Sequence, residues 1–247
     1  MIPLKSRQDL IMLKRSGAIL AAVMQKLQAS LRPGMTTLDI DLLSEELIRK
    51  AKASAAFKGY KGFPGTACIS VNEEIVHGIP GSRVILEGDI VSIDLGVNYE
   101  GFFSDMAVTL PVGKVDNARL KLIAVTKQSL DIGIKQAQVG NYLTDISHSI
   151  QSFAEGQGLS VVRQFVGHGI GTALHEEPEI PNFGRPGLGP RLKSGMVLAI
   201  EPMINLGSWE CEIMKNGWTA VTADGACSAH FEHTVAVTDK GPVILTK

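Results

Sequence analysis

The chain is poor in cysteine, and Cys68, Cys211 and Cys227 lie far apart with no CxxC pair among them. Neither a disulfide framework nor a thiolate zinc site is indicated, because both require even-numbered or closely spaced cysteines. A metal site in this chain would have to be built from carboxylates and imidazoles.

An excess of one charge is also missing. The 24 Lys and Arg against 25 Asp and Glu leave a net charge of −1, and no basic run of five residues occurs. Because a constitutive nucleic-acid binder needs clustered positive charge to neutralise phosphates, no nucleic-acid partner is expected.

Long apolar runs are absent as well. No stretch approaches 18 uncharged apolar residues, and residues 1–10 lack the apolar segment of a secretory signal. We therefore expect a cytoplasmic protein without a membrane partner. With 247 residues, 45% hydrophobic and 20% charged, the chain can bury a sizeable core as a single α+β domain.

Apolar residues at intervals of three and four predict four helices. The first begins after Ser6 and ends before residue 33, and the second begins near Thr37 and ends within 51–56. The third begins at 116–117 and ends at 140, and the fourth begins at a Thr144 cap and ends after 153. Short β-branched runs predict strands over 66–71, 89–97, 106–110, 160–165, 196–200 and 234–238. Helices, strands, helices and strands in that order favour α+β over alternating α/β.

A faint internal repeat accompanies this order. Segment 34–40 matches 140–146 at an offset of 106, and 88–94 matches 195–201 at an offset of 107. The second match places Asp94 opposite Glu201, so each half has a carboxylate at the end of an apolar strand. We predict two pseudo-twofold halves, about 1–113 and 114–247, with these strand ends meeting at the centre.

Four carboxylates lie in apolar surroundings: Asp94, Asp105, Glu201 and Glu232. For Asp94 alone, a solvent-facing acid on a strand is the favoured interpretation. Two strands joined by the turn at 96–101 would nevertheless put Asp94 and Asp105 on one face. Burying four acids together costs on the order of several kcal/mol for each acid unless cations compensate the charge. The four carboxylates therefore indicate a pair of divalent metals.

Histidines complete the candidate site. His168 lies between glycines in GHGIG (167–171), which suits close approach of a metal, although a structural hydrogen bond is the commoner role of a lone histidine. The motif lacks the GxGxxG register of a dinucleotide site. His77 and His175 are either surface imidazoles or donors to a scissile amide. An oxygen-rich donor set favours manganese or ferrous iron, while cobalt and zinc also fit, and two such ions support hydrolysis.

Motifs along nearly the whole chain carry a family resemblance. They are NEEIVHGIP (72–80), SIDLGV (92–97), FSDMAVT (103–109), GHGIGTALHEEPEIPNFG (167–184), EPMI (201–204), MKNGWTAVTADG (214–225) and FEHTVAVTDKGPVILT (231–246). As a set and in this order they resemble the type I methionine aminopeptidases. The resemblance implies the pita-bread fold, in which two αβ halves surround a curved antiparallel sheet with helices outside.

The resemblance also implies a role for each site residue. Asp94, Asp105, His168, Glu201 and Glu232 would bind two divalent ions, with Asp105 and Glu232 bridging. His77 and His175 would be catalytic imidazoles that contact substrate, and Glu201 would move a proton towards the leaving amine. The methionine side chain would occupy a pocket of Tyr60, Phe63, Cys68 and Trp218.

The implied activity is removal of N-terminal methionine from peptides and nascent chains with a small second residue, by attack of a metal-bound hydroxide on the first peptide bond. The substrates would include chains at the ribosome exit, and we expect a monomer. The 31 residues from Glu201 to Glu232 leave no room for the helical insertion of type II enzymes, and the start at the first helix is typical of short bacterial enzymes.

Two positions depart from the family pattern. Leu174 replaces an aromatic residue, and Phe63 replaces a tyrosine. Two alternatives stay open: a proline-directed peptidase of the same fold, which would share all five ligands, and a binding module that has lost catalysis.

Overall fold

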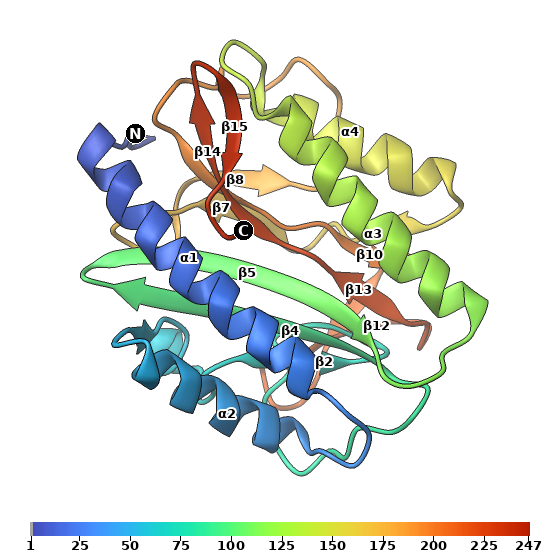
Figure 1. Ribbon diagram of the computed structural model, residues 1–247. Helices are drawn as coiled ribbons and strands as arrows, with labels where there is room; N and C mark the ends of the chain where they lie inside the picture. The colour runs from blue at the N-terminus through green and yellow to red at the C-terminus, as the bar shows by residue number, and fades with distance from the viewer. Residues whose placement is uncertain (1) are drawn as a thin grey trace.

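The computed structural model describes residues 2–247 (Figure 1), and four α-helices lie within that range. They are α1 (Arg7–Ser30), α2 (Thr37–Lys50), α3 (Asn117–Gln136) and α4 (Leu143–Gly156), with a short 3₁₀ turn η1 (Tyr60–Gly62). All four predicted helices are confirmed. The predicted start of α1 is also confirmed: the Ser6 hydroxyl accepts from the Asp9 N–H, and the Asp9 carboxylate accepts from the Ser6 N–H.

Two predicted helix ends are wrong. Helix α3 ends at Gln136 rather than at 140. The Gln136 carbonyl accepts from the Gln138 N–H at 2.7 Å and from the Asn141 side-chain amide at 3.0 Å, which replaces the bonds of a continuing helix. Helix α4 has its N-cap at Tyr142, not Thr144. Asp145 accepts from the Tyr142 N–H at 2.7 Å, whereas the Thr144 hydroxyl donates to the carbonyl of Leu188 at 2.9 Å.

The strands are all paired antiparallel within the described range. They are β1 (Ser54–Ala55), β2 (Cys68–Val71), β3 (Glu74–Val76), β4 (Ile90–Tyr99), β5 (Phe102–Pro111), β6 (Ser160–Val161), β7 (Val166–Gly169), β8 (Glu176–Pro181), β9 (Val197–Ile200), β10 (Met203–Asn205), β11 (Cys211–Ile213), β12 (Ala220–Thr222), β13 (Ser228–His230), β14 (His233–Thr238) and β15 (Gly241–Ile244). One large sheet has β1, β2 and β5 paired with β4, and the other has the order β15-β14-β9-β7-β8. The α+β prediction is therefore confirmed.

Two strand predictions are wrong. Only Ser160–Val161 of the run 160–165 is a strand, because the chain leaves the small sheet of β10 there and enters the large sheet at β7. The turn predicted at 96–101 occupies only Glu100 and Gly101, both with positive φ, and Gly96 lies inside β4. Gly96 is required because a Cβ there would come within 2.7 Å of the Phe57 ring.

The two large sheets meet along β5 and the start of β14. The Thr234 hydroxyl donates to the Asp105 carbonyl at 2.8 Å and accepts from the Asp105 N–H at 2.9 Å. The Glu232 N–H donates to the Ala107 carbonyl at 2.9 Å. These bonds join the sheets directly beside two of the predicted metal ligands, so we call this junction the seam.

The helices cover the outside of the sheets. Helix α1 packs lengthwise across β4 and β5, and α3 and α4 pack against each other beside the C-terminal strands (Figure 1). The inner side of α1 buries Leu13, Leu20, Met24 and Leu27, at the predicted spacing. No helix among residues 2–247 has the length and apolar composition needed to span a membrane.

Local structure recurs at the offsets of the sequence repeat. The Gly34 N–H donates to the Ile85 carbonyl before α2, and the Gly140 N–H donates to the Leu192 carbonyl before α4. Both glycines adopt left-handed φ angles near +90°, which a side chain would disfavour. The repeated glycines thus have a backbone reason, while the boundary between halves at about residue 113 stays a prediction.

Candidate metal centre and active site

A cavity of about 250 Å³ opens at the seam. It is lined by Phe57, Tyr60, Lys61, Phe63, Cys68, His77, Asp94, Asp105, His168, Leu174, His175, Glu201, Trp218 and Glu232. Every residue that the sequence placed in the metal, catalytic and substrate sets lines this one cavity. Phe57 and Lys61 also line it and were not predicted.

The hairpin of β4 and β5 positions the first two acids. Asp94 lies opposite Ala107 and Asp105 lies opposite Gly96. The acids are therefore diagonal neighbours on the same face of the hairpin, as the sequence predicted.

The other three candidate ligands come from the second sheet. Glu201 directly follows β9 and Glu232 directly precedes β14, and these strands pair so that Ile200 faces His233. His168 lies in β7, opposite Ala199 of β9. Strand pairing thus brings three separate segments of the chain to the edge of the hairpin.

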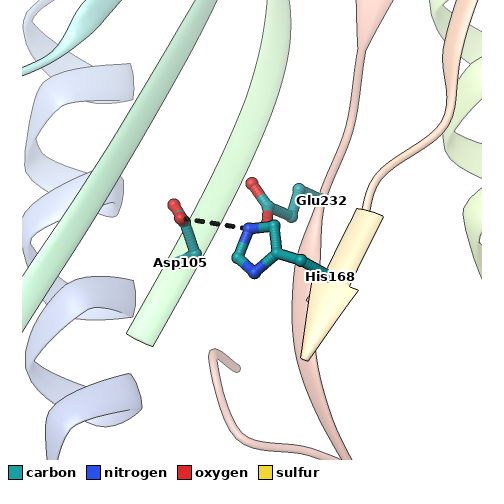
Figure 2. Close-up of side chains that lie close together, drawn as sticks. All are labelled: Asp105, His168 and Glu232. Atoms are coloured by element: carbon teal, nitrogen blue, oxygen red, sulfur yellow. Dashed lines mark ion pairs between the residues drawn. The ribbon is translucent and has the colours of Figure 1, made fainter. Parts of the chain in front are cut away.

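The ligand atoms converge at short distances. The Nε2 of His168 lies 3.9 Å from Oδ2 of Asp105 and 3.6 Å from Oε1 of Glu201. Figure 2 shows Asp105, His168 and Glu232 pointing toward one another, and one ligand atom of each lies within 4.8 Å of the others. One cation could bind all three of these side chains.

The carboxylates are costly to ionise where they lie. Burial, the largest cause, raises the pKa of Asp94 and of Glu201 to about 7 each. Burial, with additional repulsion from neighbouring carboxylates, raises the pKa of Asp105 and Glu232 well above the usual range. Oδ1 of Asp94 and Oε1 of Glu232 are buried without a hydrogen-bond partner. Buried oxygens without partners beside one imidazole fit a divalent cation.

The ring orientation of His168 also fits a metal ligand. Its Nδ1 lies 2.9 Å from the Gly169 carbonyl, which can only accept, so Nδ1 carries the proton and Nε2 presents its lone pair to the acids. The flanking glycines have a different reason from the one predicted. A Cβ at Gly167 would collide with the Ala199 carbonyl, and one at Gly169 with the Glu177 carbonyl, so the space they leave is filled by neighbouring backbone rather than by a ligand.

His175 lies at the mouth of the cavity in contact with two aromatic rings. Its ring stacks on Tyr60 with centroids 5.1 Å apart, and its Nδ1 lies 2.9 Å from the Tyr60 hydroxyl. Its centroid is 4.1 Å from that of His168. Loss of solvent around the ring, helped by the nearby His168 ring and Lys61 ammonium, lowers the pKa of His175 to about 3, so the imidazole is neutral near pH 7.

His77 follows β3 with a left-handed φ of +59°, an unfavourable conformation for a residue with a side chain. Its ring is nearly perpendicular to those of Phe165 and Trp218, with centroids 5.4 and 6.4 Å away. Burial lowers the pKa of His77 to about 4. A second neutral imidazole is thus fixed in the cavity wall.

The predicted side-chain pocket forms a continuous apolar wall. Phe63 and Trp218 pack edge to face at 5.2 Å, and Cys68 is buried, which raises the pKa of its thiol and keeps it protonated. Leu174 is buried in the same cluster. The pocket has the aromatic and sulfur lining that suits a thioether.

Sequence reasoning missed His230. It is 1% exposed at the end of β13, its Nε2 lies 3.5 Å from Oε2 of Glu201, and that nitrogen has no hydrogen-bond partner. The available signal was a second titratable residue two positions before Glu232, within the segment 229–235.

Known proteins resemble this chain over its full length. The model of metallopeptidase family M24 matches residues 12–239. "Methionine aminopeptidase" of Clostridium perfringens is 52% identical, covering 100% of this chain and 99% of the relative. "Methionine aminopeptidase 1" of Bacillus subtilis is 49% identical, covering 100% of both.

Solved structures agree with this. The crystal structure of a methionine aminopeptidase from Thermotoga maritima superposes with a TM-score of 0.98 at 45% identity, covering 100% of both chains. A prolidase from Pyrococcus furiosus shares only the fold, with a TM-score of 0.80 at 21% identity, covering 99% of this chain and 65% of that one. The chain therefore belongs to metallopeptidase family M24, whose pita-bread fold it has, and within that family to the type I methionine aminopeptidases.

Proposed function

We propose that this enzyme hydrolyses the first peptide bond of peptides and nascent proteins that begin with methionine and have a small second residue. One observation carries the proposal: a single cavity unites five candidate metal ligands, two neutral imidazoles and an apolar side-chain pocket. The first set can activate water, the second can donate to a developing oxyanion, and the third can select an apolar side chain.

Asp94, Asp105, His168, Glu201 and Glu232 would hold two divalent ions, with Asp105 and Glu232 bridging. The buried oxygens without partners and the raised pKa of each carboxylate support this assignment. Bound divalent ions supply positive charge that polarises the scissile carbonyl and lowers the pKa of water. Four carboxylates with one imidazole favour manganese or ferrous iron, and cobalt or zinc also fit.

His175 would donate to the carbonyl oxygen as negative charge develops there. In this proposal the Tyr60 hydroxyl donates to Nδ1 across the 2.9 Å contact, which leaves the His175 proton on Nε2. A neutral imidazole with its proton on Nε2 can donate a hydrogen bond from that nitrogen across the neutral pH range. His77 would contact the scissile amide from the opposite wall, and Glu201 would carry a proton to the leaving amine nitrogen.

The methionine side chain would lie against Phe63, Cys68 and Trp218, with the Tyr60 ring at its border. No charged group is needed there, because burial of the thioether against aromatic rings supplies the binding energy. The cytoplasmic location, the monomeric state and action at the ribosome exit stay predictions.

The proposal is tested with purified protein loaded with manganese or cobalt. Released methionine is measured by mass spectrometry from Met-Ala-Ser, and an Xaa-Pro dipeptide serves as the matched control. We expect release from the first peptide only. Cleavage of the Xaa-Pro peptide alone would favour a proline-directed enzyme, and a protein that binds no metal and cleaves neither peptide would be a binding module.

A further inference from the structure

A nearly buried ion pair connects the N-terminal segment to the loop that bears His175. The Lys5 ammonium contacts Oε2 of Glu176, and the two side chains are only 7% and 10% exposed. The partners are 171 residues apart in sequence, so the pair joins opposite ends of the chain. An ion pair with so little solvent exposure is unusual for Lys and Glu, which are mostly exposed. This burial suggests that the pair has a specific structural role.

Glu176 organises the turn immediately before it. Its Oε1 accepts from the Thr172 N–H at 2.9 Å and from the Ala173 N–H at 3.1 Å. The turn is also held by the Phe103 N–H, which donates to the Gly171 carbonyl at 2.8 Å. His175 is the residue directly before Glu176, so the Glu176 carboxylate fixes the backbone of the turn that carries the His175 side chain.

Lys5 is itself fixed. Its N–H donates to the Gly195 carbonyl at 2.7 Å, at the turn that precedes β9. Its side chain then passes over Gly171, where a Cβ would collide with Cε and Nζ of the lysine. The lysine backbone is therefore held by a hydrogen bond, and its ammonium reaches Glu176 through the space left by the missing side chain of Gly171.

We propose that Lys5 is a positioning residue for His175, acting through the Glu176 carboxylate. With the ammonium removed, Glu176 would keep a nearly buried, uncompensated charge, which is strongly unfavourable. The carboxylate would turn towards solvent and release the Thr172 and Ala173 amides. His175 would then lose its alignment with the scissile carbonyl, and small displacements of a catalytic group cost large factors in rate.

This inference rests on the proposed function, and kinetics of methionine release from Met-Ala-Ser form its first test. Lys5→Met keeps the length of the side chain and removes the charge. We expect kcat to fall about 10-fold or more, with KM changed less than about 2-fold because the side-chain pocket is untouched. Lys50→Met is the control, since Lys50 also pairs with a glutamate, Glu46, but is 62% exposed on α2. It should leave kcat unchanged.

A compensating variant separates positioning from general loss of stability. Glu176→Gln retains an oxygen that can accept from the Thr172 and Ala173 amides but carries no charge for Lys5 to balance. Lys5→Met should therefore cost much less kcat in the Glu176→Gln background than in the wild-type protein. Equal losses in the two backgrounds would overturn the proposal.

Amide hydrogen exchange of the turn gives a readout that needs no activity. In Lys5→Met the Thr172 and Ala173 amides should exchange at least about 10-fold faster, while amides of α1 and β4 keep wild-type protection. Unchanged exchange at the turn would refute the positioning role. If the wild-type protein released no methionine, the proposed function would fail, yet the exchange data would still show whether Lys5 orders this turn.

Discussion

The contact between Tyr60 and His175 gives the sharpest test of the catalytic geometry. Tyr60→Phe removes one oxygen atom and keeps the ring that stacks on the imidazole at 5.1 Å. The variant loses the 2.9 Å hydrogen bond to Nδ1, which in our proposal keeps the His175 proton on Nε2. The metal ligands and the apolar wall of Phe63 and Trp218 are left in place.

The size of the effect follows from the one bond removed. A hydrogen bond between neutral side chains contributes about 0.5–1.5 kcal/mol net, which corresponds to about 2- to 13-fold in an equilibrium or a rate. If Tyr60 selects the tautomer that donates to the oxyanion, the loss belongs to the transition state. We therefore expect kcat to fall by about that factor while KM changes little.

Steady-state kinetics of Met-Ala-Ser cleavage would measure this, with bound metal quantified in both proteins. Two results would refute the reasoning. Wild-type kcat would show that the hydroxyl does not act on His175 during catalysis. A rise in KM with unchanged kcat would show that Tyr60 serves only as a wall of the side-chain pocket.

Three further predictions concern the metal centre and its neighbours. Asp105→Ala and Glu232→Ala should each abolish activity and lower the bound metal, measured by elemental analysis; full metal content with either variant would contradict the bridging role. His175→Ala should retain metal but lose about 10²-fold or more in kcat, because an oxyanion donor is removed, and a wild-type rate would exclude that role. In chelated protein, Asp94 and Glu201 should favour unfolding increasingly as pH rises from about 4 to 7, because they release protons with a pKa near 4 when unfolded and about 7 when folded, while the lowered pKa values of His77 and His175 act in the opposite direction. Glu201→Gln removes one of these carboxylates, so without metal its melting temperature should exceed that of the unsubstituted protein by more at pH 8 than at pH 5, and an equal difference at the two pH values would argue against it.

Local sequence patterns predicted the parts of the fold that depend on neighbouring residues. The capping box of Ser6 and Asp9 marks the start of α1 because both partners lie within one turn. The expectation that Asp94 and Asp105 share a face matches the register because a hairpin is a local structure. The set of site residues also lines one cavity, although their individual roles stay predictions.

Long-range contacts explain what the sequence could not predict. Gly96 looked like a turn residue, but its lack of a side chain makes room for Phe57, about forty positions earlier. Thr144 looked like a helix cap, but its hydroxyl donates to the carbonyl of Leu188. A partner 44 positions away cannot be predicted from the local sequence. The pairing of Lys5 with Glu176 spans 171 positions. In each case the deciding neighbour is brought in by the fold.

The location of the ligands at the seam links metal binding to the joining of the sheets. Asp94 and Asp105 come from the β4–β5 hairpin, while His168, Glu201 and Glu232 come from the second large sheet. Without cations the carboxylates raise one another's pKa, so repulsion acts across the junction that the backbone bonds hold together. Cations bound there would attract carboxylates from both sheets, and this attraction would replace the repulsion between the carboxylates. Since the unfolded chain does not preform this set of ligands, metal binding should stabilise the folded state in proportion to RT ln(1 + [metal]/Kd).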